Sequence, residues 1–575
     1  MRGDPDGRVS GVERGKGPRG KGRGAGRAAT APAKPAPVAA DASMPLRLVG
    51  IAAILAAAIV ASWPTIRYEF LNWDDPVYVL ENPLIRSFSW ENLSRIFTKP
   101  YFFNFLPLHL LSYSVDYSFW GVKPFGYHLH QVLLNALNAA LCFAVVRRLL
   151  GNFTVALVAA VLFAVHPTHV EAVAWVSSRK ELLSTTFLLL STYFYLQARG
   201  AHALRRWPYA ASVAAFMLGL LSKLNIVVAP LFFVLVDVFT LKRQRRDRKF
   251  WMEILVNKIP YLVAGLIALR LNASAQVTAQ AAYAKDPLQY LMVKGHAVWN
   301  YLALLAGLRE GSPDYDTPAL AVSIAPIVFN LAGLLVLPAI ILFAARRGNR
   351  SLALGAGWIL AMLLPVLVFP LVTYMAERYL YAPSIGFCWI LGAGIVALGR
   401  RVPPGAARVA ATAAIALVPF IVFGYRTTVY NPVWANSETL WTYAIARSQD
   451  YRVYTNLAQV RIDQKRYEEA EDLLQKSVKV ENVTSYRSLA ALYYATRRYP
   501  EAMAAIDRAA EILARKGNEP MERAEILYTR GAIYWVLSEK QKALDAWEEA
   551  LVYNPGHAQV REWVRVARAE TPKAP

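Results

Sequence analysis

The chain has little cysteine and comparatively little acidic charge. Its only two cysteines, Cys142 and Cys388, lie inside apolar runs, which argues against a disulfide framework and leaves the redox compartment open. Asp and Glu number 40 against 63 Lys and Arg, so the formal net charge is +23. In a soluble protein such an excess indicates nucleic-acid binding, so the placement of the basic residues decides its meaning.

Apolar residues are abundant and come in long blocks. They make up 56% of the chain, more than a single soluble core can hide. Since a helix needs about 17 to 25 apolar residues to cross the hydrocarbon core, the blocks predict an all-α, polytopic membrane bundle of about eleven spans. The expected spans are residues 46–64, 130–148, 153–167, 181–198, 208–222, 225–241, 254–270, 322–345, 352–372, 380–399 and 407–425.

The Lys and Arg clusters predict the orientation of this bundle. Basic loops stay on the cytoplasmic side, so the N-terminus is expected inside and the region after residue 425 outside. Topology then accounts for the positive charge, and we expect no nucleic-acid partner. The Arg/Gly/Ala/Pro-rich tail has no hydrophobic period and is expected to be disordered. The basic clusters are the tail at 1–43 and residues 147–148, 199–206, 242–249, 346–350 and 400–408.

One further segment, residues 287–308, is long enough to span a membrane. It contains Lys294, His296 and Asn300, and counting it as a span would move the arginines at 346–350 outside. We therefore expect an interfacial or re-entrant helix on the outer face.

Charged residues gather in the segments expected on the outer side. Asp74 and Asp75 lie in the first outer loop, the run HPTHVEAVAWVSSRKEL begins at His166, Lys223 stands in a tight turn, and TYMAERYLYAPS begins at Thr373. Carboxylates and cations on one membrane face suit group transfer at the bilayer surface. A carboxylate can act as base for an acceptor hydroxyl, while cations stabilise a phosphate leaving group.

Each of these motifs also has a structural interpretation. Asp before Pro, as at Asp75, is typical of a solvated turn, and His before Pro, as at His166, can end a helix. The run HPTHVE lacks the HExxH spacing that places two imidazoles on one helix face, which argues against a zinc site. Lys223 can snorkel from a helix end. Glu377 and Arg378 can form an exposed salt bridge worth under about 1 kcal/mol.

Five runs follow one another between residues 70 and 388. They are FLNWDDPVYVLENPLI, FLPLHLLSYSVDYSFWGVKPFGYHLHQVLLNALNA, HPTHVEAVAWVSSRKELLSTTFLLLSTYFYL, LLSKLNIVVAP and YMAERYLYAPSIGFC. In this order they resemble the landmarks of the transmembrane, tetratricopeptide-repeat O-mannosyltransferase-like proteins. The resemblance implies a membrane glycosyltransferase of the C-type fold, which takes its sugar from a polyprenyl phosphate carrier.

The resemblance also implies roles for single residues. The family's acidic motif falls on Asp74 and Asp75, the implied catalytic carboxylates, and we expect Asp75 to be the less dispensable because Pro76 stiffens the chain beside it. The family's Lys-Glu turn falls on Lys223, but Leu224 stands in place of the Glu. The residues implied to bind the donor phosphate or sugar are Lys223, Arg378, Glu377, Arg179, His166, His169 and Glu171.

Near-periodic helical pairs follow the apolar blocks. Ala470, Ala502 and Ala543 lie 32 and then 41 residues apart, with an insertion at 514–520 in the longer step. This pattern predicts a tetratricopeptide-repeat α-solenoid that binds extended peptide or another protein, with a structural cap or dimer contact as the alternative. The expected domains are a basic cytoplasmic tail at 1–43, a transmembrane domain at 44–425, a linker at 426–450, repeats at 451–567 and a tail at 568–575.

Two functions fit these features. The first is an enzyme that moves a sugar, with mannose as a candidate, from a polyprenyl phosphate donor to an extracytoplasmic acceptor such as a protein Ser or Thr hydroxyl. The second is a non-catalytic scaffold or assembly factor anchored in the membrane. The charged outer loops favour the enzyme, because a scaffold does not need them. Transport is disfavoured because the charges sit at loop edges.

The expected surroundings follow from the same features. No cofactor is expected beside the lipid-linked donor. Two carboxylates without a third ligand do not decide whether the reaction needs a divalent metal. The partners are membrane lipid, the donor and an acceptor protein or peptide held by the repeats. The Ala/Arg-rich composition suggests a bacterial inner membrane, with the repeats in the periplasm.

Overall fold

The computed structural model describes residues 43–102, 104–199, 204–240, 247–273, 286–371, 373–517 and 519–570. Over these ranges the regular structure is helical, with two isolated β-bridges and no strand, which confirms the predicted all-α class. Residues 1–42 of the expected tail at 1–43 and residues 571–575 of the expected tail at 568–575 lie outside these ranges, as do residues 200–203 and 242–246 of two basic clusters.

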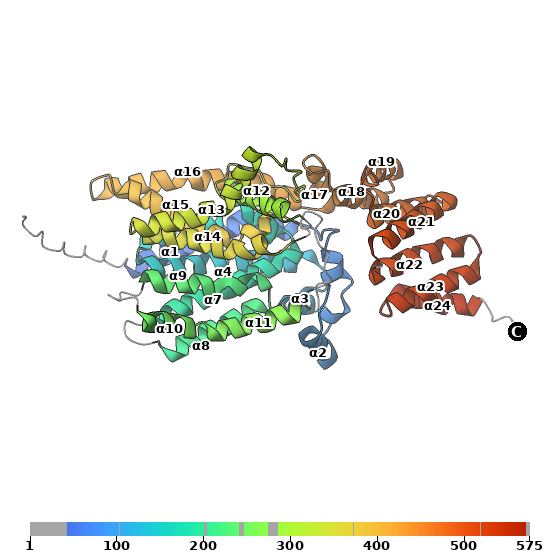
Figure 1. The fold of residues 1–575 in the computed structure, drawn as a ribbon, viewed down its shortest axis with the longest axis horizontal. Helices are drawn as coiled ribbons and strands as arrows, with labels where there is room; N and C mark the ends of the chain where they lie inside the picture. The colour runs from blue at the N-terminus through green and yellow to red at the C-terminus, as the bar shows by residue number, and fades with distance from the viewer. Residues whose placement is uncertain are drawn as a thin grey trace, which may run out of the picture. The chain divides into compact units, whose positions relative to one another are not determined.

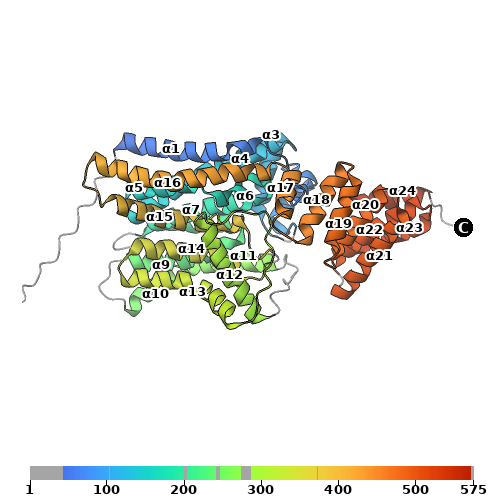
Figure 2. The same ribbon diagram turned by 90° about the horizontal axis from the view of Figure 1, so that it is seen from above.

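Helices occupy all eleven ranges expected to span the membrane. Five of the described helices are long and apolar enough to cross a bilayer, or up to seven if each bent pair is one span, so the chain is a multi-pass membrane protein while the count of eleven is not confirmed. Figures 1 and 2 show α13, α14 and α15 side by side. The helices are α1 (Met44–Ser62), α4 (Pro124–Leu150), α5 (Phe153–Ala164), α7 (Arg179–Ala198), α8 (Arg206–Leu220), α9 (Ala229–Thr240), α10 (Arg248–Val256), α11 (Ile259–Ala273), α13 (Ile324–Arg346), α14 (Arg350–Val368), α15 (Pro383–Gly399) and α16 (Ala406–Tyr430).

The short helix α5 lies in the main hydrophobic core between α4 and α15. It is apolar on all sides, which is the pattern of a buried helix. Four of its alanines, Ala156, Ala159, Ala160 and Ala164, are buried. Small residues at this spacing let neighbouring helices approach closely, so α5 holds α4 and α15 in place beneath the outer loops.

A buried network of charged groups joins α7, α9 and the α10–α11 junction. Asp237 Oδ1 accepts a hydrogen bond from Arg199 Nε at 2.6 Å, and its Oδ2 lies 2.7 Å from both Lys258 Nζ and the Tyr195 hydroxyl. Buried charges persist where they satisfy one another in this way. The network lies at the end of α7 that faces away from the outer loops.

Residues 287–308 form α12 (Pro287–Leu305), which is not among the described helices apolar enough to cross a membrane. A Cβ on Gly295 would lie 1.8 Å from the carbonyl oxygen of Asn330 in α13, so glycine is required for this close approach. Lys294 is buried and donates to the carbonyl oxygen of Val366 at 2.6 Å, near the C-terminal end of α14. The interfacial placement of α12 stays a prediction.

Short helices and turns form the layer that connects the spans on the side of the first loop. A small core that includes Tyr78, Val79, Tyr113 and Tyr127 stabilises this layer. Its elements are η1 (Trp63–Arg67), η2 (Pro76–Leu80), η3 (Pro83–Ile85), α2 (Trp90–Thr98), α3 (Pro107–Trp120), η4 (Pro167–His169), α6 (Val170–Ala174), η5 (Val176–Ser178), η6 (Leu224–Val228) and η8 (Glu377–Leu380).

The C-terminal region is built of stacked helix pairs, as predicted. The alignment residues Ala470, Ala502 and Ala543 are fully buried, because small side chains let the paired helices approach. The insertion at 514–520 lengthens α21 to 18 residues, against 11 in α19. The helices are α18 (Tyr451–Asp463), α19 (Tyr467–Ser477), α20 (Val483–Ala495), α21 (Tyr499–Lys516), α22 (Pro520–Val536), α23 (Lys540–Tyr553) and α24 (Ala558–Glu570).

The segment 426–450, for which we expected a linker, is largely helical. It contains the end of α16, η9 (Asn431–Trp434) and α17 (Ser437–Ile445). Trp434 and Trp441 are buried in a core that also includes Leu71 and Trp175. This segment therefore packs on the first outer loop.

Candidate functional site

Asp75 holds the first outer loop against η5. Its side chain is fully buried, and its Oδ2 accepts the backbone N–H of Leu71 at 2.9 Å. Its Oδ1 accepts the backbone N–H of Ser177 at 3.0 Å and also the Ser177 hydroxyl. Burial raises the pKa of Asp75 to about 6. Both carboxylate oxygens are thus engaged by donors of the protein itself.

Asp74 is the half-buried neighbour whose carboxylate is left available. Its backbone carbonyl accepts the N–H of Tyr78 at 3.0 Å and so belongs to the turn that starts η2. Within the described part of the chain the Asp74 carboxylate has no hydrogen-bond or ion-pair partner, but it lies close enough to Lys180 to attract it. The turn therefore buries one aspartate and presents the other.

Lys223 forms an ion pair with Glu181, which joins the turn before η6 to the first turn of α7. The amide of Asn225 lies 3.4 Å from the second oxygen of Glu181. The Lys223 ammonium also lies 5.2 Å from the centroid of the Tyr379 ring. Leu224 stands where the resembled family has Glu, and here α7 supplies the carboxylate that pairs with the lysine.

Arg378 is anchored by Glu171 and framed by aromatic rings. Its guanidinium pairs with one oxygen of Glu171, and its backbone N–H donates to the other at 2.7 Å. The guanidinium carbon lies 5.0 Å from the Tyr379 ring centroid, 5.3 Å from that of Trp175 and 5.9 Å from that of Trp73. An arginine held in this way keeps its orientation, which suits recognition of a phosphate.

These side chains form one site, which we call the charged cluster and define as Asp74, Lys180, Glu181, Lys223 and Arg378. The electrostatic neighbours of Lys180 include Asp74, Glu181 and Arg378, so the members from the first loop, α7 and η8 lie together. Glu181 pairs with Lys223 and Glu171 pairs with Arg378, so the three cations of the cluster are balanced by these two carboxylates and Asp74. Such a site can accept an anionic group beside a free carboxylate.

His109 of α3 is a member of this region that the sequence analysis did not single out. It is fully buried, and neither ring nitrogen has a hydrogen-bond partner within the described residues. Its ring lies edge-on to Tyr78 and Tyr113, with centroids 5.1 and 4.6 Å away. Burial and the nearby cations, including Lys180, hold the pKa of His109 well below its usual range. The signal in the sequence was its position as a lone imidazole in the landmark run FLPLHLL.

Arg179 lies in the framework beside the charged cluster. It is fully buried and pairs with Asp116 of α3, whose other oxygen lies 2.8 Å from His130 Nδ1. Its guanidinium also donates to the carbonyl oxygen of Tyr127 at 2.9 Å. These contacts join α3, α4 and α7, so the position of Arg179 indicates a structural role.

His166 and His169 are also buried away from the charged cluster. His166 Nε2 lies 3.0 Å from the carbonyl oxygen of Leu305, and His169 Nε2 lies 2.8 Å from Ser384 Oγ. The two imidazoles therefore join the turn after α5 to the ends of α12 and α15. In the described residues no group of three or more His, Cys, Asp or Glu could hold a metal ion.

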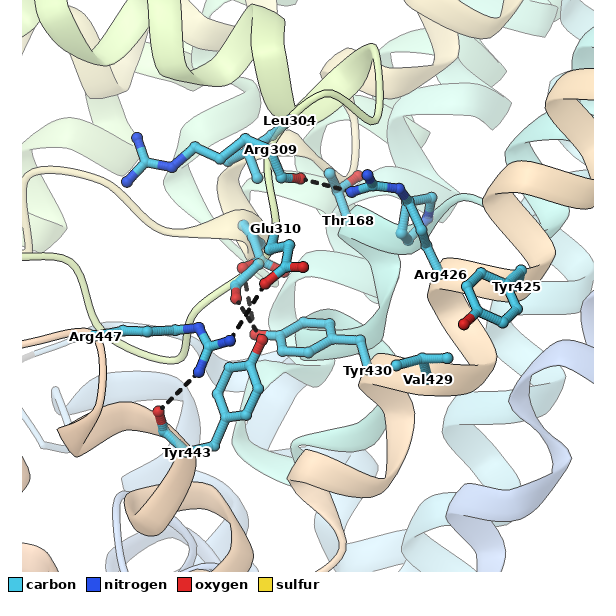
Figure 3. A pocket seen from close by; sticks show the side chains of 13 residues that line it. Thr168, Leu304, Arg309, Glu310, Tyr425, Arg426, Val429, Tyr430, Tyr443 and Arg447 are labelled. Atoms are coloured by element: carbon cyan, nitrogen blue, oxygen red, sulfur yellow. Dashed lines mark hydrogen bonds and ion pairs between the residues drawn. The ribbon is translucent and has the colours of Figure 1, made fainter.

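Glu377 precedes Arg378 but faces different partners. Its carboxylate is buried and accepts the backbone N–H of Ser312 at 2.6 Å and the Tyr315 hydroxyl at 2.7 Å. Burial, together with the nearby Glu171, raises the pKa of Glu377 to about 8. Glu377 lines a separate cavity of about 310 Å³, drawn in Figure 3.

Comparisons with known proteins agree with the sequence landmarks. A profile of the dolichyl-phosphate-mannose-protein mannosyltransferases matches residues 109–275, and a tetratricopeptide-repeat profile matches residues 452–480 and 483–516. The chain is 27% identical to protein O-mannosyl-transferase Tmtc1 of Drosophila melanogaster, over 64% of this chain and 53% of that protein. It is 25% identical to protein O-mannosyl-transferase TMTC4 of Mus musculus, over 60% of this chain and 53% of that protein.

These matches confirm the resemblance, and the chain spans about half the length of the curated relatives it matches. Among solved structures, ArnT from Cupriavidus metallidurans bound to undecaprenyl phosphate aligns with a TM-score of 0.40 and 15% identity, over 84% of this chain and 80% of that chain. We draw no inference from a similarity at that level.

Proposed function

We propose that this chain is a membrane glycosyltransferase that moves a sugar from a polyprenyl phosphate donor to a hydroxyl group on a protein outside the cytoplasm. The observation that carries the proposal is the charged cluster, in which the carboxylate of Asp74 is unengaged and lies beside Lys180 while Asp75 fixes the loop that bears it. The relatives are named protein O-mannosyl-transferases, which supports mannose as the sugar and a protein as the acceptor.

In this proposal Asp74 is the general base. It takes the proton of the acceptor hydroxyl as the hydroxyl oxygen attacks the anomeric carbon of the sugar. The bond from that carbon to the phosphate oxygen breaks, and the electron pair leaves with the polyprenyl phosphate. Lys180, Lys223 and Arg378 stabilise the growing negative charge on the phosphate, which acts as leaving group.

The carboxylates that pair with these cations set their positions. Glu171 holds the Arg378 guanidinium, and Glu181 holds the Lys223 ammonium. A catalytic group that is already oriented needs no reorganisation when the reaction occurs. The tetratricopeptide repeats present the acceptor protein, which fits the packing of α17 against the first outer loop.

The proposal is tested with Asp74→Asn in the purified full-length protein. General-base catalysis contributes about 10²- to 10⁴-fold to a rate, so transfer of sugar from a polyprenyl phosphate donor should fall by that factor. Thermal stability should change little, because the Asp74 side chain makes no hydrogen bond within the described residues. Asp75→Asn should instead lower stability as well as transfer, since it disturbs the bonds to Leu71 and Ser177.

Glu81→Gln serves as the matched control, because Glu81 is an exposed carboxylate of the same loop. Its transfer rate should stay at the parental value. A folded Asp74→Asn protein that transfers sugar at the parental rate would show that the loop is only a turn. That result would leave the membrane-anchored scaffold as the better reading of the chain.

A further inference from the structure

The cavity that Glu377 lines is distinct from the charged cluster. Its volume is about 310 Å³, and it is lined by the end of α16, the loop after α12, the turn at η4 and α17. Figure 3 shows Arg426 of α16 and Arg447 of the turn after α17 on different sides of Glu310. None of the five residues of the charged cluster lines this cavity.

Positive charge exceeds negative charge around the cavity. Arg426 Nη1 donates to the carbonyl oxygen of Arg309 at 3.2 Å, and neither of these arginines has a carboxylate partner among the described residues. Arg447 lies 3.2 Å from Glu310, whose side chain is 72% exposed. The guanidinium groups of Arg426 and Arg447 thus lie on either side of one solvated carboxylate, while the Arg309 side chain is directed away, toward Asn300 and the Tyr315 ring.

Glu377, which also lines the cavity, adds little negative charge. Burial raises its pKa to about 8, so the carboxyl is mostly protonated at neutral pH. Its neutral form repels an incoming anion much less than a carboxylate would.

An exposed apolar stripe on α16 leads to Arg426. Val418, Val422, Tyr425 and Val429 are 64%, 42%, 69% and 58% exposed, and their spacing places them on one face of the helix. The helix that carries them is long and apolar enough to span a membrane. The stripe therefore faces lipid, and the cavity opens beside it.

The cavity lies where two candidate spans end. The side-chain amide of Asn431 donates to the carbonyl oxygen of Ala61, which joins the end of α16 to the end of α1. Trp63 follows α1 and is 47% exposed, and Tyr425 in the last two turns of α16 is 69% exposed. Exposed Trp and Tyr at span ends are typical of the head-group region of a bilayer.

We propose that this cavity binds the phosphate head group of an anionic membrane phospholipid, with Arg426 and Arg447 on the phosphate oxygens and an acyl chain along Val418, Val422 and Val429. Arginine forks match phosphate oxygens, and the apolar stripe supplies the contact that a free anion would not need. The site shares no residue with the charged cluster. Lipid binding at this cavity and the proposed transfer reaction can therefore be tested separately.

The test measures binding of a fluorescent phosphatidylglycerol to the purified full-length protein in neutral detergent. Arg426→Gln and Arg447→Gln should each weaken binding about tenfold, as expected for loss of one charge-assisted hydrogen bond. Arg426→Lys should retain most of the affinity. The matching phosphatidylcholine should bind at least about tenfold more weakly to the parent protein, because its choline group cancels the negative charge.

Arg95→Gln is the control, since Arg95 is an exposed arginine of the first outer loop that does not line the cavity. Its affinity for phosphatidylglycerol should equal that of the parent. Thermal unfolding of each variant confirms that it is folded, and Arg447→Gln, in the exposed turn after α17, gives the result if Arg426→Gln does not fold. Parental affinity in both Gln variants would overturn the proposal. Displacement of the lipid by inorganic phosphate alone would overturn it too, because it would assign the cavity to a free anion.

Discussion

At the scale of single residues, adjacent charged side chains take different roles. Asp75 is buried on Ser177 while Asp74 faces Lys180, and Glu377 bonds to Ser312 while Arg378 pairs with Glu171. Consecutive residues in a tight turn or 3-10 helix point in different directions. One member of each pair can therefore hold the backbone while the other reaches the site.

Glu377 makes stability depend on pH. Its folded-state pKa of about 8 lies above the ordinary value of 4.5, so the folded protein keeps the proton that the unfolded chain releases. The free energy of unfolding should fall as pH rises from about 4.5 to about 8, by at most about 1.4 kcal/mol per pH unit, and level off above pH 8. Glu377→Gln keeps the oxygen that accepts from Ser312 and Tyr315, so its melting temperature should fall less steeply than that of the parent between pH 6 and 8.

The control for this experiment is Glu81→Gln, which removes an exposed carboxylate and should leave the parental slope unchanged. Equal slopes for the parent and Glu377→Gln would mean that another group titrates in this window.

At the scale of elements, the ion pair of Lys223 with Glu181 couples the turn before η6 to α7. If Lys223 also meets the donor phosphate, Lys223→Gln should weaken donor use by about 1.5 to 3 kcal/mol, as for a hydrogen bond to a charged group. The effect should appear as a raised KM for the donor at constant acceptor. Steady-state kinetics of the variant measure it directly.

Lys258 provides the comparison for Lys223, because it is also a lysine that pairs with a carboxylate. It is buried and pairs with Asp237 near the C-terminal end of α9, whereas Lys223 lies just before η6 at the other end of this segment. Lys258→Gln should lower stability and leave the donor KM of the folded protein unchanged. If Lys223→Gln behaves in the same way, Lys223 serves the fold and not the donor.

The helix pair α22–α23 depends on one glycine. A Cβ on Gly531 would lie 2.4 to 2.8 Å from three ring atoms of Trp547, which is fully buried. Gly531→Ala should therefore destabilise this pair by about 1 to 3 kcal/mol, the range for overpacking a core. Denaturant unfolding followed by tryptophan fluorescence measures the change.

Gly556→Ala is the matched control, because a Cβ there meets its nearest neighbour, Asn554 Oδ1, at an ordinary 3.5 Å. It should unfold as the parent does. A Gly531→Ala protein of parental stability would show that Trp547 moves aside at no cost.

At the scale of the whole molecule, the packing of α17 on the first outer loop brings the start of the repeat region to the charged side of the bundle. The Trp441 indole donates to Asn72 Oδ1 at 2.6 Å, and its ring lies 5.1 Å from that of Trp73, which directly precedes the pair Asp74–Asp75. Arg452 of α18 pairs with Asp314 at 3.0 Å. A protein bound to the repeats would therefore be held near the loop that bears Asp74.

The predicted orientation can be tested by labelling single cysteines in intact cells. Glu91→Cys and Lys542→Cys should react with an impermeant maleimide, while Arg347→Cys should react only after the membrane is opened, because basic loops stay inside. All three positions are exposed. The native Cys142 and Cys388 are buried, so they should not react with the maleimide and can be kept in all three variants. Labelling of Arg347→Cys in intact cells would contradict the proposed orientation.

The sequence anticipated helices and motifs better than the roles of single side chains. The position of α5 followed from its apolar run, and the buried Ala470, Ala502 and Ala543 followed from their repeat spacing. Arg179, His166 and His169 are each buried with partners from the protein itself, so their expected contact with the donor stays a prediction. His109 was missed because its place in the run FLPLHLL marks a lone imidazole but does not show that both ring nitrogens lack a partner within the described residues.

The sequence by itself determined the membrane class, the helix positions, the repeats and the gathering of charge in loops, because block length, periodicity and composition are local properties of the chain. Only the tertiary structure decided which charged side chains stay available. Ser177 lies 102 residues from Asp75, and Glu181 lies 42 residues from Lys223. Whether a carboxylate or cation has a hydrogen-bond partner depends on the groups that folding brings close to it. These groups are distant along the chain, so the local sequence does not identify them.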